Sequence, residues 1–160
     1  MRQANASVHV SEIRGRIPIG GHRMLDLTFA TQRLPGVSVI SVAGEIDSAN
    51  AGLLDRHIQQ TRRMPGEHVV IDLSEARFIG SAGLRVLLNT HTFARQHGGV
   101  LHLAAPHPKV ARFMDVTQAG TVLHVHATVE EAVIAALRRS PSRLYPSESH
   151  RAAGETLTQA

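Results

Sequence analysis

The sequence of 160 residues contains no cysteine and no tryptophan, and it has only one tyrosine and four phenylalanines. The absence of cysteine excludes disulfides, thiolate-bound zinc, iron–sulfur clusters and a thiol nucleophile, and it fits a cytoplasmic protein. No apolar run approaches the roughly 18 residues of a membrane span, so we expect no membrane contact. Since 42% of the residues are apolar, the composition is that of a globular protein whose core is built from aliphatic side chains.

Charge of one sign does not dominate the chain, although its net charge is +4. Residues 1–23 carry four arginines and one glutamate, whereas residues 24–139 carry eleven basic and ten acidic groups. The central part therefore has no basic face with stacking aromatics, and we expect no direct nucleic-acid partner. We interpret residues 1–23 as a flexible basic arm and residues 140–160, rich in serine, threonine and proline, as a disordered tail.

Between these ends, residues 24–139 alternate between strand-like and helix-like patterns. Proline followed by glycine at Pro35-Gly36 suits a type II turn, because proline presets one dihedral angle and glycine accepts a positive one. We therefore expect a hairpin there, followed by strands that alternate with helices and run parallel. The expected strands are Leu25–Thr31, Val37–Ala43, His68–Leu73, Val100–Ala104 and Val122–His126.

The first two expected helices are identified by their ends. Ser48 can cap the first helix, which ends before Pro65-Gly66. The second helix runs from Ser81 to about His97, where Gly98-Gly99 is a typical stop. Between the strand that ends at residue 73 and this helix, we expect a short loop.

The last two expected helices have equally clear start signals. Pro108 can open a short helix, with Gly120 past its end. Thr128 and Glu131 have the spacing of a capping box, which predicts that the final helix begins there. The residues that this final helix is expected to bury are Val129, Ala132, Val133, Ala136 and Leu137.

Polar and apolar residues alternate in the expected strands, which predicts how the helices are distributed. His102 lies between two leucines, while His124 and His126 flank a valine. A sheet covered on both faces would have continuous apolar strands instead. The predicted fold is thus an α/β fold, in which a mixed β-sheet (an N-terminal hairpin and then parallel strands) has its helices mainly on one face.

One segment carries most of the functional information. It runs from the strand Val69–Ser74 through a short loop to Phe78–Leu84, and it places Ser81 at the start of a helix. Together with Gly44–Asp47 upstream, this segment resembles the STAS domain of bacterial anti-sigma factor antagonists. The resemblance extends in order over about residues 24–139, from the hairpin to the last helix.

The resemblance implies a regulator that catalyses nothing and needs no cofactor. The unphosphorylated protein would bind an anti-sigma factor with serine kinase activity and so release the sigma factor for transcription. The kinase would then phosphorylate Ser81 and dissociate, and a serine phosphatase would reset the switch. Gly80 departs from the family, which commonly has an acidic residue at this position, and Ala82 stands where a second hydroxyl residue is common.

The chemistry of the segment agrees with such a switch. A helix N-terminus has unpaired N–H groups and a partial positive charge, so a phosphoryl group on Ser81 would be tolerated. Small glycines around the hydroxyl leave room for a partner, and Arg85 is placed either to pair with a phosphate or to contact that partner. Parallel strands also bring Asp47 and Ser48 to the edge of the sheet that carries Ser81. The predicted partner-binding residues are Asp47, Ser48, Gly80, Ala82, Gly83 and Arg85.

Other interpretations of these residues remain open. A serine before a helix is often only a cap, and Asp47 at a strand end is often only solvated. A nucleophilic serine is disfavoured because a nucleophile elbow needs glycine two residues before it, where Ile79 stands. STAS domains also act as scaffold or sensor modules that bind a protein partner without being phosphorylated.

The eleven histidines raise the question of a metal site. His124 and His126 share one face of a strand, and His102 can join them from a neighbouring strand. Three imidazoles are a set that can hold zinc. We interpret them instead as half-exposed polar positions on the open face of the sheet, and we predict no metal site.

Overall fold

The computed structural model describes residues 13–15 and 27–139. The arm predicted over residues 1–23 and the tail predicted over residues 140–160 thus lie outside the described residues, apart from the three residues of strand β1. The strands are β1 (Ile13–Gly15), β2 (Leu27–Leu34), β3 (Val37–Ile46), β4 (His68–Ile79), β5 (Leu101–Ala104) and β6 (His124–His126). The helices are α1 (Ala51–Thr61), α2 (Ser81–Gln96), α3 (Pro108–Val116), the short 3-10 helix η1 (Ala119–Thr121) and α4 (Val129–Arg139).

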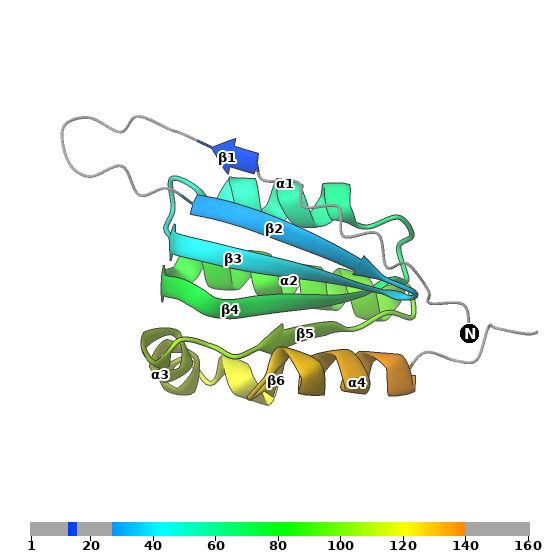
Figure 1. Cartoon of the computed structure of the whole chain (residues 1–160). Helices are drawn as coiled ribbons and strands as arrows, with labels where there is room; N and C mark the ends of the chain where they lie inside the picture. Colours follow the sequence, from blue (N-terminus) through cyan, green and yellow to red (C-terminus); the bar gives the residue numbers. More distant parts are fainter. Residues whose placement is uncertain (1–12, 16–26, 140–160) are drawn as a thin grey trace, which may run out of the picture.

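The strands form one mixed sheet in the order β1-β2-β3-β4-β5-β6 (Figure 1). The pairs β1–β2 and β2–β3 are antiparallel, whereas the pairs β3–β4, β4–β5 and β5–β6 are parallel. The hairpin turn lies at Pro35-Gly36, and the φ angle of Gly36 is 81°, as a type II turn requires. The predicted mixed sheet, with a hairpin followed by parallel strands, is therefore confirmed.

Strand β4 is longer than the sequence pattern indicates. We expected a loop between Leu73 and Phe78, but β4 continues without a break to Ile79. Its pairing with β3 absorbs two register shifts between residues 41 and 45. Most polar residues in this part of β4 are exposed, while Ala76 and Ile79 are buried, so this half of the strand is partly solvated. The bulged pairing carries the sheet directly up to the start of helix α2.

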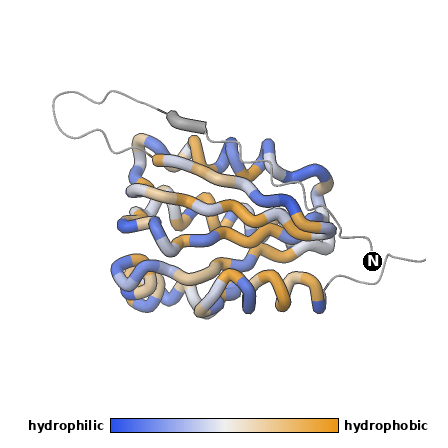
Figure 2. The backbone as a smooth tube through the Cα atoms, viewed as in Figure 1, coloured by the Kyte–Doolittle hydropathy of each residue, from blue (hydrophilic) through white to orange (hydrophobic). Residues whose placement is uncertain are grey.

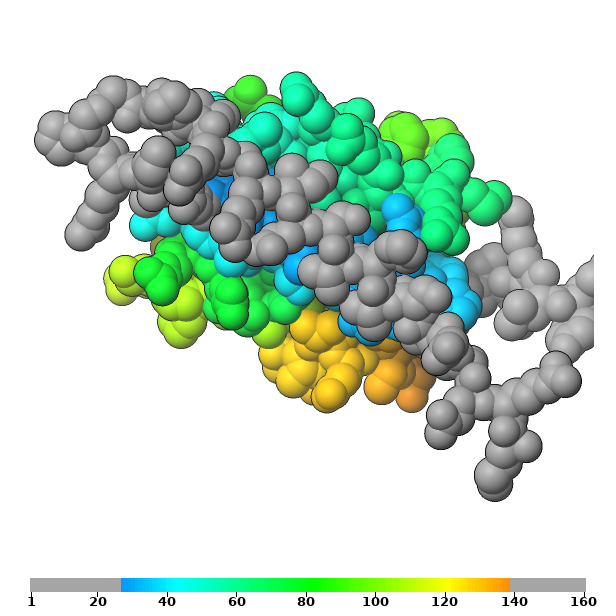
Figure 3. All heavy atoms as spheres, turned by 45° about the horizontal axis from the view of Figure 1, so that its top comes forward, coloured from blue at the N-terminus to red at the C-terminus, as the bar shows by residue number. Residues whose placement is uncertain are grey.

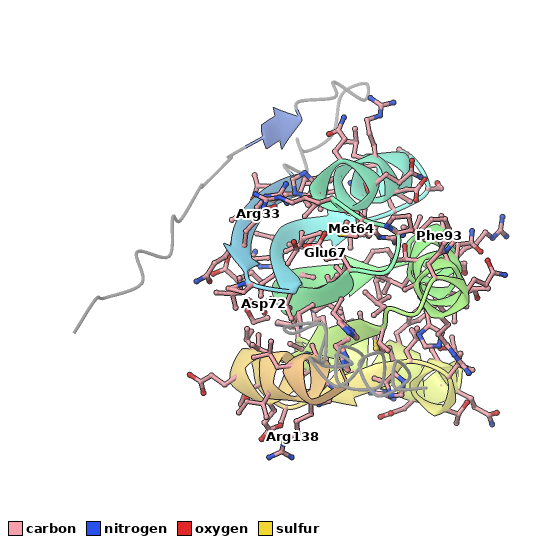
Figure 4. The ribbon with its side chains drawn as sticks, turned by 90° about the vertical axis from the view of Figure 1, so that its right-hand side faces the viewer. Arg33, Met64, Glu67, Asp72, Phe93 and Arg138 are labelled. Atoms are coloured by element: carbon pink, nitrogen blue, oxygen red, sulfur yellow. The ribbon has the colours of Figure 1, made fainter. Side chains whose placement is uncertain are left out.

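The helices occupy both sides of the sheet, but unequally. Helices α1, α2 and α3 pack with residues such as Ile40 and Ile71 in the main core, and α4 packs on the opposite face over Val39 and Val70. Figure 3 shows the atoms of α1 and of α4 well apart, with atoms of the strands between them, and Figure 2 shows hydrophobic residues along the central strands and along α4. Figure 4 looks along the strands and places Asp72 on the side away from α2, which carries Phe93.

Three helix ends test the sequence signals. Gly98 has a φ angle of 82° after α2, which confirms the predicted stop. Helix α3 ends at Val116, so Gly120 lies past its end as expected, and the residue in the left-handed region after the helix is Gln118 (φ 57°). At the start of α4 the Glu131 N–H donates to Thr128 Oγ1 (3.1 Å), and the Ala127 N–H donates to the Glu131 carboxylate (3.2 Å). This is the predicted capping box, except that the Glu131 carboxylate accepts from the N–H of Ala127 and not from the N–H of Thr128.

The last helix buries fewer of its side chains than we expected. Ala132 and Ala136 are fully buried, and Val129 and Val133 are partly buried against them. Leu137, however, is 47% exposed, so its predicted burial is wrong. The side of α4 that packs on the sheet carries the two alanines and these two valines, over Val37, Val39, Val70 and Ala104.

Candidate functional site

Ser81 is the first residue of α2, at the carboxyl end of β4, and its side chain is exposed. The N-cap is Gly80, which has no side chain to bond the helix N–H groups. No acidic residue lies in the first turn of α2. The positive end of the helix dipole therefore faces solvent beside the Ser81 hydroxyl, without a neighbouring carboxylate in that turn to neutralise it.

The ends of β3 and β4 are joined directly beside Ser81. The Gly80 N–H donates to the Ile46 carbonyl over 2.9 Å, and the Leu84 N–H donates to the Gly80 carbonyl over 3.0 Å as α2 begins. Ile46 immediately precedes Asp47, and Gly80 immediately precedes Ser81. The structure thus brings together the two loops that the sequence placed at one edge of the sheet.

The loop after β3 is built around two side chains. Asp47 Oδ1 accepts hydrogen bonds from the Ala49 N–H (2.9 Å) and the Asn50 N–H (3.1 Å). Asn50 Oδ1 accepts from the Asp47 N–H (2.8 Å), and its amide donates to the Glu45 carbonyl (2.8 Å). These bonds form an Asx-type turn that fixes the loop before α1. Asp47 is half-buried and therefore has a structural role in the loop next to Ser81.

Asn50 is a residue that the sequence analysis missed. We expected Ser48 to cap the first helix, but the N-cap is Asn50, and Ser48 is exposed in the turn before it. The Asn50 side chain makes no capping hydrogen bond to the helix, because it bonds the Asp47 N–H and the Glu45 carbonyl instead. The Asp47 side chain holds the two intervening residues in a turn before the helix.

The glycines of the segment have different roles. Gly83 is buried, and a Cβ there would lie 2.7 Å from Ile46 Cγ2 and 2.8 Å from Ile79 Cγ1, so α2 needs glycine to pack on the strand ends. Gly80 is half-buried, and a Cβ there would make ordinary contacts, the nearest at 3.4 Å to the Phe78 ring. The lack of a side chain is therefore a packing requirement at position 83 but not at position 80.

The surface around Ser81 combines charge with an exposed ring. Arg85 is exposed on the next turn of α2, and Ala82 is half-buried against the core. Phe78, which the sequence analysis did not single out, is 48% exposed at the end of β4. Exposed aromatic rings and arginines are the side chains most often found at the centre of protein interfaces. The arrangement suits recognition of a protein and modification of a hydroxyl.

The histidines of the second face do not form a metal centre in the described ranges. No group of three histidine, aspartate or glutamate residues within residues 13–15 and 27–139 is arranged to hold a metal ion. The interpretation of His102 as half-exposed is nevertheless wrong, because its side chain is only 1% exposed. His124 and His126 are half-buried beside it.

Within residues 13–15 and 27–139, no helix has the length and hydrophobicity needed to cross a membrane.

Comparison with known proteins identifies the family. Residues 28–132 match the STAS domain. The chain is 26% identical over 94 residues to the anti-sigma F factor antagonist of Paenibacillus polymyxa, an alignment that covers 58% of this chain and 80% of that protein. The protein belongs to the STAS domain family.

Solved structures agree with this assignment. The crystal structure of an anti-sigma factor antagonist from Mycobacterium paratuberculosis has 30% sequence identity and a TM-score of 0.63, and the alignment covers 69% of this chain and 94% of that one. The anti-sigma factor antagonist SpoIIAA in its unphosphorylated form has 19% identity and a TM-score of 0.55, with 66% and 92% of the two chains covered. The latter similarity concerns the fold alone.

Proposed function

We propose that this protein is an anti-sigma factor antagonist that is switched off by phosphorylation of Ser81. The observation that carries the proposal is the exposed Ser81 hydroxyl at the N-terminus of α2, on a surface that the Gly80–Ile46 hydrogen bond joins to the Asp47 loop. The names of the related proteins support the same function. The partner is an anti-sigma factor with serine kinase activity, and the protein itself catalyses nothing.

In the proposed cycle the unphosphorylated protein binds the anti-sigma factor in the cytoplasm and releases the sigma factor. The partner then transfers a phosphoryl group from ATP. Ser81 Oγ forms a bond to the γ-phosphorus, the bond to the ADP oxygen breaks, and the hydroxyl proton passes to a base of the kinase. A serine phosphatase later hydrolyses the ester with water, which returns the hydroxyl and releases inorganic phosphate.

The size of the electrostatic change is adequate for a switch. Phosphorylation adds about −1.5 to −2 charges at neutral pH. An unpaired charge buried in an interface costs roughly 3–5 kcal/mol. At about 1.4 kcal/mol for each factor of ten, the affinity for the partner falls by roughly two to four orders of magnitude. The helix dipole and Arg85 stabilise the phosphorylated form within this protein, so the penalty falls on the complex and not on the fold.

The first experiment identifies the partner. The protein is incubated with ATP and candidate anti-sigma kinases of the same organism, and its intact mass and peptides are measured. We expect one phosphate, on Ser81. Stable binding of a kinase without any modification would favour the alternative function, a STAS scaffold or sensor module that binds its partner unphosphorylated.

Binding measurements then test the switch itself. Ser81→Ala is expected to bind the kinase partner constitutively, and Ser81→Asp is expected to bind it more weakly. The matched control is Ser74, an exposed serine on β4, where the same two substitutions should not alter affinity. Equal affinities of the Ser81→Ala and Ser81→Asp variants would overturn the switch.

A further inference from the structure

Five histidines form a continuous group that reaches from α2 across the last strands of the sheet. The rings that face one another are His91–His124, with centroids 5.7 Å apart, His102–His124 at 5.6 Å, His102–His126 at 5.1 Å and His68–His102 at 6.5 Å. They come from α2 (His91), β4 (His68), β5 (His102) and β6 (His124 and His126). We call this group the histidine network.

Two members of the network are joined by a hydrogen bond that depends on protonation. His102 Nδ1 and His126 Nε2 lie 3.0 Å apart. One of the two nitrogens has to carry a hydrogen and the other a lone pair, because two N–H groups cannot bond one another. At most one of the two rings can be charged while this bond exists. His102 is 1% exposed, so water cannot readily replace the lost partner.

His91 lies in an unfavourable place for a charge. Its side chain is only 3% exposed, and neither Nδ1 nor Nε2 has a hydrogen-bond partner. The charged and titratable groups that face His91 are Arg95, one turn further along α2, and His124 on β6, which itself faces His102 on β5. Burial, and to a lesser extent the positive charge of Arg95, lowers the pKa of His91 below its ordinary value.

We propose that the histidine network is a proton-sensitive lock between helix α2 and the β5–β6 edge of the sheet. The neutral rings pack α2 against β6, and the His102–His126 bond holds β6 to β5. Protonation of both of these rings breaks that bond and brings positive charges together, so the β6–α4 end of the protein loosens as the pH falls. The lock acts on α2, the helix whose first residue is Ser81, but its operation does not depend on phosphorylation.

The direction of the effect follows from which state binds protons more readily. A histidine whose pKa is lowered in the folded protein is protonated first in the unfolded chain, so stability is complete above the unfolded value of 6.5 and declines below it. Each proton that only the unfolded or loosened state takes up increases the opening equilibrium about tenfold for every pH unit. Two network protons would increase it by up to about a hundredfold for each unit.

The test measures both global and local opening. Urea unfolding is followed between about pH 5 and pH 8 with EDTA present, and amide exchange is measured as protection factors at the same pH values. As the pH is lowered from about 8 to about 5, we expect the protection factors of β6 and α4 to decrease by at least tenfold more than those of the β2–β3 hairpin. His91→Leu fills the buried site without polar atoms. The change of the unfolding equilibrium constant for each pH unit should be smaller in this variant than in the wild type by a factor of up to about ten.

Two further variants keep the result interpretable. His126→Gln preserves a hydrogen-bonding side chain next to His102 but removes the pair of rings that cannot both be charged while they are bonded, so it should also flatten the slope. His97→Gln removes an exposed histidine from the same helix and should leave the slope unchanged. The proposal is overturned if His91→Leu and His126→Gln both keep the wild-type slope. It is equally overturned if protection of β6 and α4 follows that of the hairpin at every pH.

Discussion

Gly83 on α2 packs so closely on Ile46 at the end of β3 that a Cβ at position 83 would lie 2.7 Å from Ile46 Cγ2. Real Cβ atoms essentially never come this close to another heavy atom. The first turn of α2 is therefore seated directly on the strand ends, and this seating sets the position of Ser81 two residues earlier. The geometry of the proposed phosphorylation site thus depends on a residue that a partner does not need to touch.

The first prediction concerns this contact. Gly83→Ala should lower the free energy of unfolding by about 1–2 kcal/mol, because overpacking against a stiff, β-branched isoleucine costs about 1–3 kcal/mol while alanine recovers up to about 1 kcal/mol of helix propensity. The matched control is Gly52→Ala in α1, where nothing lies within 4 Å of the added Cβ. That change should raise stability by up to about 1 kcal/mol. Urea denaturation of both variants measures the difference, and equal effects would contradict the packing argument.

The second prediction concerns the helix dipole at Ser81. An acidic residue at the start of α2 should stabilise the fold, because the first turn now contains none. Ser81→Asp should raise the unfolding free energy by about 0.3–1 kcal/mol at low ionic strength, and added salt should reduce the gain. Ser81→Asn is the neutral control. A less stable aspartate variant would mean that phosphorylation strains the fold instead of changing only the complex.

The order of strands and helices was predictable from the sequence because it depends on local signals. The turn at Pro35-Gly36, the stop at Gly98 and the capping box at Thr128 and Glu131 each act over a few residues, and the structure has all of them. The proximity of the two loops at the sheet edge also followed from the parallel strand order. The hydrogen bond from the Gly80 N–H to the Ile46 carbonyl joins these loops in the structure.

Features that depend on contacts between distant segments were missed. The continuation of β4 to Ile79 requires a bulged partner strand, which no pattern within β4 reveals. The burial of His102 depends on neighbours contributed by β4 and β6, so alternation along its own strand indicated the face of the sheet but not the exposure. The exposure of Leu137 depends likewise on which side of α4 packs on the sheet, and that side carries Ala132 and Ala136.

The third prediction concerns Gly80, which stands where the anti-sigma factor antagonists that the sequence resembles commonly have an acidic residue. A Cβ at this position would make only ordinary contacts, and the backbone (φ −92°, ψ −179°) is open to any residue. Gly80→Asp should therefore fold and be at least as stable as the wild type, since glycine and aspartate are both accepted N-cap residues and the carboxylate lies at the positive end of the helix dipole. If the proposed kinase partner recognises an acidic residue before the serine, the variant is phosphorylated faster. Gly80→Asn is the uncharged control, and equal rates for the two variants would mean that the kinase does not read this charge.

The fourth prediction concerns pH and a histidine outside the network. The His57 ring on α1 stacks on Phe29 with centroids 4.6 Å apart, and its Nε2 lies 2.8 Å from Thr31 Oγ1. Burial lowers the pKa of His57 below 6.5, so the unfolded chain binds the proton more readily and the stability contribution is lost as the pH falls below that value. His57→Phe should remove up to about 1.4 kcal/mol per pH unit of this dependence.

At about pH 8, where His57 is neutral in both states, the same variant should cost about 1 kcal/mol, because it leaves Thr31 without its histidine partner. Adding Thr31→Val removes the orphaned hydroxyl as well, and the double variant should regain most of that loss while keeping the flatter pH profile. Urea titrations at about pH 5.5 and pH 8 separate the two effects. An unchanged pH slope in His57→Phe would mean that His57 is protonated as easily in the folded protein as in the unfolded chain.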